Sequence, residues 1–199
     1  ISNFIGDRVR KYYSRPSHVI YPPVNVSKFK IENLKFKIEN YFLMVGRLVS
    51  YKRFDLAIKS FNQNGLPLKI VGIGPELNKL KRVANKNIEF LGLVSDEKLA
   101  ELYSKAQACI FPQEEDFGIV PLESMASGRP VIAYRAGGAM ETIVENKTGI
   151  FFNEQNPESL QAAIEKFHNL EFSPKVCRGH AEKFDIEIFK NNISTLLKI

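Results

Sequence analysis

Short apolar runs rich in β-branched residues alternate with helix-length amphipathic stretches along most of this 199-residue sequence. This alternation is typical of parallel strands joined by crossover helices. The runs predict six strands: YFLMV, LKIV, IEFL, ACIF, PVIA and GIFF. Apolar positions at three- and four-residue spacing predict helices over residues 53–62, 76–85, 96–105, 119–127, 139–145 and 157–168. We therefore expect a Rossmann-like, doubly wound parallel α/β sheet with its ligand crevice at the carboxyl ends of the strands.

Caps mark the start of two of these helices. Ser95 precedes Asp96 and Glu97, and serine before acidic residues is a favoured N-cap. Asn156 precedes Pro157, whose fixed backbone angle suits the first helical position. We expect helices to begin at Asp96 and Pro157.

The two ends of the sequence do not fit the alternation. Residues 1–12 have a helical pattern with no strand beside them, and Pro22 and Pro23 impose extended backbone within residues 14–40. Near the other end a helix is predicted with these apolar residues on one side: Ile186, Phe189, Ile193, Leu196 and Leu197.

These features divide the sequence into three parts. We expect residues 1–38 to be the end of a preceding domain and a connector, and residues 39–175 to be the α/β domain. Residues 176–199 are expected to form a helix that packs toward a domain outside this sequence.

The charge balance narrows the choice of partners. A formal net charge of +6 favours anionic partners such as nucleotide phosphates, lipid head groups or nucleic acid. The basic residues lack the interleaved aromatic and glycine pattern of an RNA-binding sheet, so nucleic acid is not expected. A solvated basic surface is favoured over a membrane-surface patch, and peripheral membrane contact stays open.

Other features indicate a soluble cytoplasmic protein, with the inner face of a membrane as an alternative location. No apolar run approaches the roughly 18 residues of a membrane span, and no series of charged, apolar and cleavage-site residues has the pattern of a signal peptide. Cys109 and Cys177 have no metal-ligand spacing, which favours reduced structural cysteines.

The first candidate site follows the first predicted strand, in MVGRLVSYKRFD. Gly46 allows a tight turn, and Arg47 and Lys52 follow at the opening of a helix. Two cations at such a turn suit a diphosphate, because guanidinium grips two oxygens and ammonium acts as a point charge. A pair of exposed surface cations explains the segment equally well.

The second candidate site is VGIGPE, after the second predicted strand. Gly72 and Gly74 would let the main chain approach a ligand closely, although a simple glycine turn is the stronger interpretation. A dinucleotide-binding GxGxxG motif is not favoured, because Leu77 occupies the third glycine position.

The third candidate site is QEEDFGIVPLESMASGRPVIA, where a helix begins near Pro121. The amides of Gly118, Ile119 and Val120 would then point outward from the helix start and form an anion site with its positive dipole.

Carboxylates flank this anion site. Helix-dipole complementarity explains Glu123 alone, but not the cluster of Glu114, Glu115 and Asp116 before it. A carboxylate beside a phosphate is repelled by it, so its presence makes sense chiefly if it accepts hydrogen bonds from sugar hydroxyls.

Glu115 and Glu123 also form a Glu-x7-Glu motif. GRLVSYKR and FLGLVSDEKLAELYSKAQACIFP precede it, and RAGGAMETIVENKTGIFF follows it. In this order the segments resemble the C-terminal donor-binding domain of glycosyltransferase family 4, whose members are retaining enzymes with the two-domain GT-B fold. The resemblance covers nearly the whole sequence. The amino-acid sequence of these segments is most similar to that of GDP-mannose-dependent mannosyltransferases of O-antigen and related surface polysaccharides.

The resemblance implies roles for the site residues. Arg47 and Lys52 match the cations that bind the donor diphosphate and stabilise the leaving group. Glu115 matches the motif glutamate near the hydroxyls of the transferred sugar, and Glu123 matches the one that holds the ribose hydroxyls. Four amides match the turn around the sugar and the distal phosphate: Phe117, Gly118, Ile119 and Val120.

The resemblance also places Leu93 and Val94 beside the base, and Gly46, Gly72 and Gly74 complete the expected donor site. Departure of a nucleoside diphosphate develops negative charge, which cations and helix-end amides can stabilise. Neither a metal nor another cofactor is therefore expected.

In the family the acceptor pocket belongs to the N-terminal domain. We expect a saccharide or lipid-linked acceptor to bind mainly there, and this fragment to bind donor weakly without transferring sugar. A glucosyltransferase or glucan synthase using UDP- or ADP-glucose is the nearest alternative. An NAD-dependent Rossmann enzyme and a non-catalytic nucleotide-binding module are alternatives of other classes.

Overall fold

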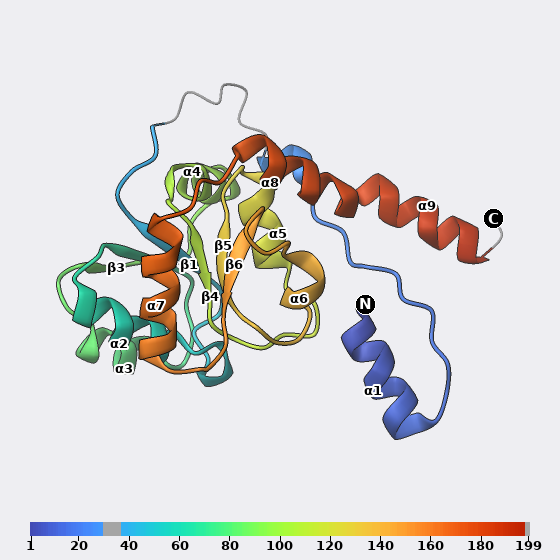
Figure 1. Ribbon diagram of the computed structural model, residues 1–199, viewed down its shortest axis with the longest axis horizontal. Coiled ribbons are helices and arrows are strands. Elements are labelled where there is room, and N and C mark those ends of the chain that lie inside the picture. The colour runs from blue at the N-terminus through green and yellow to red at the C-terminus, as the bar shows by residue number, and fades with distance from the viewer. Residues whose placement is uncertain (30–36, 198–199) are drawn as a thin grey trace.

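The computed structural model describes residues 1–29 and 37–197 and contains a six-stranded parallel sheet (Figure 1). The strands are β1 (Phe42–Val45), β2 (Leu68–Val71), β3 (Ile88–Gly92), β4 (Cys109–Phe111), β5 (Val131–Tyr134) and β6 (Gly149–Phe152). Their order is β3-β2-β1-β4-β5-β6, which confirms the predicted doubly wound sheet. The order reverses between β1 and β4, so the ligand crevice of such a fold lies beyond the carboxyl ends of these two strands.

Helices cover both faces of the sheet (Figure 1). One face carries α2 (Phe54–Asn64), α3 (Leu77–Val83) and α7 (Pro157–His168). The other carries α4 (Asp96–Lys105), α5 (Ile119–Ala126), α6 (Ala139–Thr142) and α8 (Pro174–Ala181). Because successive strand side chains point to opposite faces, Phe42 and Met44 enter the first core and Leu43 enters the second. All three are fully buried, which explains the continuous apolar run of β1.

The predicted caps are confirmed. The Ser95 hydroxyl accepts from the Lys98 amide at 3.2 Å, and the Asn156 side chain accepts from the Ser159 amide at 2.7 Å. Pro157 occupies the first turn of α7, as expected.

The start of α5 agrees with the predicted range 119–127, although Pro121 is not the first helical residue. The helix begins at Ile119, two residues before Pro121, and Gly118 is its N-cap with φ 87°. Proline fits anywhere in the first turn because the amides there have no intrahelical acceptor. Glycine at the cap tolerates the positive φ that other residues avoid.

The N-terminal segment packs onto the α/β body at both of its ends. It contains α1 (Asn3–Tyr13), in agreement with the helical pattern, and η1 (Val26–Phe29). The amides of Asn3 and Phe4 and the hydroxyl of Tyr21 donate to the Glu141 carboxylate of α6, each at 2.9 Å. Residues 14–23 are irregular as the prolines predict, whereas residues 30–36 of the expected connector lie outside the described residues.

The C-terminal part begins with a helix that the sequence pattern did not predict. Cys177 and Ala181 of α8 are buried, and Arg178 donates to the carbonyl of Ala126 at the end of α5 at 2.8 Å. The expected domain boundary at residue 175 therefore falls inside a helix that packs on α5, and the three-part division stays a prediction.

The predicted C-terminal helix is α9 (Ile186–Leu197), which extends away from the sheet (Figure 1). None of its described side chains is buried. Across the two described ranges, no helix has the length and apolar character needed to cross a membrane.

The cysteines are buried and free, as expected of structural thiols. Burial raises the pKa of both thiols, that of Cys177 to about 12.

Candidate functional site

Two loops frame the crevice at the point where the strand order reverses. One joins β1 to α2 and ends in η2 (Ser50–Lys52), and the other joins β4 to α5. Lys52 Nζ lies 2.8 Å from Glu115 Oε1, with the two side chains only 14% and 20% exposed. Gln113 Nε2 donates to the same carboxylate oxygen at 3.2 Å. The fold thus joins two predicted site residues that lie 63 positions apart in the sequence.

A cavity of about 630 Å³ surrounds this ion pair. The α5 start supplies the predicted residues Phe117, Gly118, Ile119 and Val120 to its wall. The first amides of α5 have no intrahelical acceptor, and the helix dipole adds positive charge there, so this wall can bind an anion. Ile1 and Pro22 of the N-terminal segment also line the cavity, which sequence reasoning did not foresee.

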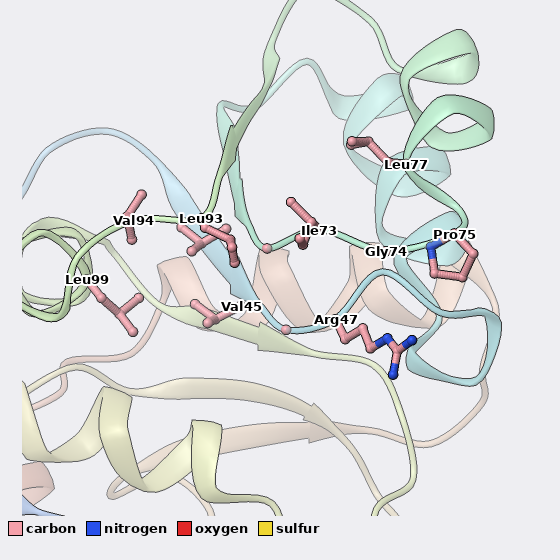
Figure 2. A pocket seen from close by; sticks show the side chains of 12 residues that line it. Val45, Arg47, Ile73, Gly74, Pro75, Leu77, Leu93, Val94 and Leu99 are labelled. Atoms are coloured by element: carbon pink, nitrogen blue, oxygen red, sulfur yellow. The ribbon is translucent and has the colours of Figure 1, made fainter.

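A second cavity, of about 690 Å³, lies beyond the ends of β1, β2 and β3 (Figure 2). Its walls are mainly apolar, with Leu93 72% exposed and Ile73 47% exposed on its rim. Six predicted residues line it: Gly46, Arg47, Gly72, Gly74, Leu93 and Val94. An apolar space with one cation is suited to a flat ring that carries a charged group.

The two cavities adjoin where Gly46, which lines the apolar one, contacts Lys52, which lines the other. A Cβ at this position would lie 3.3 Å from both Cδ and Nζ of Lys52, so the lysine stem packs along the glycine backbone. Arg47 is exposed in the apolar cavity, whereas Lys52 is enclosed in the other. The predicted cations therefore lie in adjoining cavities rather than in one.

The glycines of the second candidate site serve a different contact from the one expected. A Cβ at Gly72, which has φ 132°, would collide with the carbonyl of Gly46, and a Cβ at Gly74 would collide with the Leu48 backbone. Their close approach is to the neighbouring loop, which agrees with the simpler interpretation of a structural glycine turn.

Glu123 is placed differently from Glu115. Its carboxylate accepts from the Tyr103 hydroxyl of α4 at 2.9 Å, and it lines neither of the two cavities. Burial raises the pKa of the Glu123 carboxyl, while the Tyr103 hydrogen bond opposes that shift. The two motif glutamates thus differ in both environment and partner.

We predict that Glu123→Gln raises the melting temperature at pH 7 by a few degrees. A carboxyl whose pKa is raised on folding contributes stability at low pH that is lost as the pH rises through the folded-state pKa. The amide removes the buried charge and can still accept from Tyr103. Thermal unfolding at pH 7 and pH 4 tests this, because the advantage should vanish at pH 4, where the carboxyl is protonated. Glu165→Gln, an exposed change on α7, is the control, and a lower melting temperature for Glu123→Gln at pH 7 would contradict the prediction.

The loop that carries Glu115 is supported by residues that sequence reasoning missed. A Cβ at Gly137 would collide with the Glu115 carbonyl, and one at Gly138 with the Phe117 backbone. The Gly138 amide also donates to the Glu115 carbonyl at 2.8 Å. The paired glycines between a strand and a helix were the available signal, but the residues that they contact lie 21 to 23 positions away in the sequence.

The fold and the crevice define a class of protein. A doubly wound parallel sheet with a helix start and an enclosed lysine at its switch point is an arrangement suited to phosphate-bearing ligands. Residues 25–184 match the family of glycosyl transferases group 1, and the chain belongs to this family.

Curated relatives agree with this membership. Human alpha-1,3/1,6-mannosyltransferase ALG2 is 30% identical over 233 residues, covering 96% of this chain and 56% of that protein. The O-antigen chain mannosyltransferase RfbU of Salmonella typhimurium is 28% identical over 209 residues, covering 99% and 58%. The chain thus spans about half the length of the curated relatives it matches.

Two solved structures share the fold. Sucrose-phosphate synthase from Thermosynechococcus elongatus has a TM-score of 0.86 and 23% identity, covering 99% of this chain and 56% of that one. Anabaena HepE, solved in complex with UDP and glucose, has a TM-score of 0.75 and 20% identity, covering 91% and 56%.

Proposed function

We propose that this chain is the donor-binding half of a retaining GT-B glycosyltransferase of family 4 that transfers a hexose from a nucleotide sugar. The observation that carries the proposal is the pairing of Lys52 with Glu115 at the start of α5, in a cavity that adjoins an apolar one at Gly46. In this arrangement the base lies in the apolar cavity beside Leu93 and Val94, and the diphosphate crosses Gly46.

The sugar end of the donor then occupies the cavity around Glu115. Lys52, Arg47 and the amides at the start of α5 stabilise the charge that develops on the departing diphosphate. Glu115 accepts hydrogen bonds from the sugar hydroxyls. Glu123 is proposed to hold the ribose hydroxyls, for which its carboxylate has to exchange the Tyr103 hydroxyl for the ligand. Neither carboxylate is proposed as a nucleophile, and no metal is proposed.

Mannose from GDP-mannose is the proposed donor. Its support is the resemblance of the motif segments to mannosyltransferases and the similarity to ALG2 and RfbU, both named as mannosyltransferases. Glucose from UDP- or ADP-glucose is the alternative, favoured by the fold shared with HepE, whose structure holds UDP and glucose. Family membership argues against the NAD-dependent and non-catalytic alternatives.

The acceptor is proposed to be a growing lipid-linked or surface polysaccharide, bound mainly by parts of the protein outside this chain. The chain alone is therefore expected to bind donor without transferring sugar. Its proposed location is the cytoplasm, at the inner face of the membrane if α1 contacts lipid head groups. The exposed basic side chains of Arg10 and Lys11 on α1 would support that contact.

Calorimetric titration of the chain with GDP-mannose, UDP-glucose and ADP-glucose tests the proposed function. The expected result is binding of GDP-mannose in preference to the other two, at the micromolar to millimolar affinities usual for donor substrates. Preference for a glucose donor would overturn the mannose assignment alone. No binding of any nucleotide sugar would overturn the donor-binding proposal.

A further inference from the structure

The Lys52 ammonium, which the proposed function assigns to the donor diphosphate, is paired with Glu115, which it assigns to the sugar. The ammonium and the carboxylate lie 2.8 Å apart and are largely shielded from water. The α5 amides that would hold the same phosphate line the same cavity. A phosphate that reaches those amides therefore competes with Glu115 for Lys52.

Glu115 is distinct from the acidic residues on either side of it. Glu114 is exposed, and Asp116 pairs with Arg8 at 3.5 Å where both side chains are more than half exposed. Of the three consecutive carboxylates, Glu115 alone forms an ion pair with a cation of the cavity wall, among the residues that the structure describes. Glu114 and Asp116 also line the cavity, but Glu115 is the member of the cluster that holds the cation a phosphate needs.

We propose that Glu115 makes the site discriminate a nucleotide sugar from the bare nucleoside diphosphate, by exchanging Lys52 for sugar hydroxyls as its partner. This inference rests on the proposed function. When a nucleotide sugar binds, the phosphate takes the Lys52 ammonium, and the hydroxyls of the sugar donate to the released carboxylate. The ion pair is replaced, and no buried charge loses its partner.

The bare nucleoside diphosphate cannot make the same exchange. It has no sugar hydroxyl that could donate to Glu115, so the carboxylate loses its contact with Lys52 and receives no new hydrogen bond from the ligand. Its terminal phosphate also carries more negative charge at neutral pH than a phosphate esterified to a sugar, and this charge faces the carboxylate. Glu115 therefore favours the donor over the product diphosphate and promotes release of the product.

This role predicts opposite consequences for the two ligands when the charge is removed. Glu115→Gln frees Lys52 and ends the repulsion, so the bare diphosphate should bind about three- to tenfold tighter. The nucleotide sugar gains Lys52 but loses a charged acceptor for its hydroxyls, so its affinity should change little or fall. The preference for the sugar ester should therefore fall by about tenfold.

The experiment is calorimetric titration of the wild-type chain and its variants with GDP and GDP-mannose, or with UDP and UDP-glucose if the wild type prefers uridine. Divalent cations are left out, because they would mask the charge of the diphosphate. Glu114→Gln is the matched control: it removes the same charge from the exposed neighbour and leaves the ion pair intact. It should shift both ligands by the same small factor.

A second variant tests whether the glutamine amide in Glu115→Gln itself contacts the ligand. Glu115→Ala removes the acceptor altogether and should also tighten the bare diphosphate, while weakening the nucleotide sugar. Thermal unfolding of each variant shows that the folded chain is being titrated.

The outcomes separate the two proposals. A wild-type chain that binds neither ligand would overturn the proposed function together with this inference. A wild-type chain that binds both, with Glu115→Gln leaving their affinity ratio unchanged or weakening the bare diphosphate, would overturn the inference alone.

Discussion

Lys52→Met is expected to weaken nucleotide-sugar binding by about 30-fold, because the phosphate loses the one enclosed cation of its cavity among the described residues. The methionine keeps most of the stem that packs along Gly46, so the shape of the cavity is retained. Without the ammonium, the half-buried Glu115 carboxylate also faces the incoming phosphate with no cation between them. Calorimetric titration of the variant with the donor that the wild type prefers measures the loss.

Lys59→Met is the control for this prediction. It removes the same charge from an exposed position on α2, so donor affinity should remain within about twofold of the wild type. Equal effects of the two changes would mean that only net charge matters, and the phosphate role assigned to Lys52 would be lost.

Gly138→Ala is expected to destabilise the chain by about 1–3 kcal/mol. The backbone of Gly138 has φ −65°, which alanine adopts freely, so the cost is purely steric. The added Cβ would collide with the Phe117 backbone, and relief of the clash must displace the residue next to the Gly118 cap of α5. Donor binding should weaken as well, since the α5 amides move with that cap. Urea unfolding measures the first effect and titration the second.

Gly179→Ala is the matched control for Gly138→Ala. Gly179 lies in α8, is exposed, and has open space where a Cβ would stand. The same substitution should therefore stabilise the chain by about 0.5–1 kcal/mol through helix propensity. If Gly138→Ala behaved in the same way, the close packing of the Gly137–Gly138 turn on the Glu115 loop would be refuted.

Nearly all of the strands and helices of the α/β fold could be predicted from local sequence patterns. Each predicted strand matches an observed one to within one residue at either end, because buried parallel strands are short apolar runs, interrupted here only by Lys69 and Glu89. Ser95 and Asn156 marked helix starts because capping is a contact within one turn of the chain. The helix α8 was missed because only Cys177 and Ala181 of its eight residues are buried, too few to give a helical period.

The candidate site was predicted less evenly. Lys52 and Glu115 were both expected there, and the fold pairs them because their strands are neighbours at the switch point. Glu123 was expected to flank the anion site and hold the ribose hydroxyls; its carboxylate accepts from Tyr103 of α4, and the ribose role stays a prediction. The partner of a side chain on a helix depends on the element packed beside that helix, and the local sequence does not identify that element.

The sequence by itself determined the succession of strands and helices along the chain and the caps of the helices, because these depend on contacts a few residues apart. It also showed which cations, glycines and acids follow each strand. The tertiary structure decided the partners: Lys52 with Glu115, Gly72 with Gly46, and Glu141 with the start of α1. Each of these contacts joins segments that are distant in the sequence and adjacent only once the parallel sheet has formed. Which residues form these contacts is therefore decided by the order of the strands in the sheet and by the helices and loops packed on it.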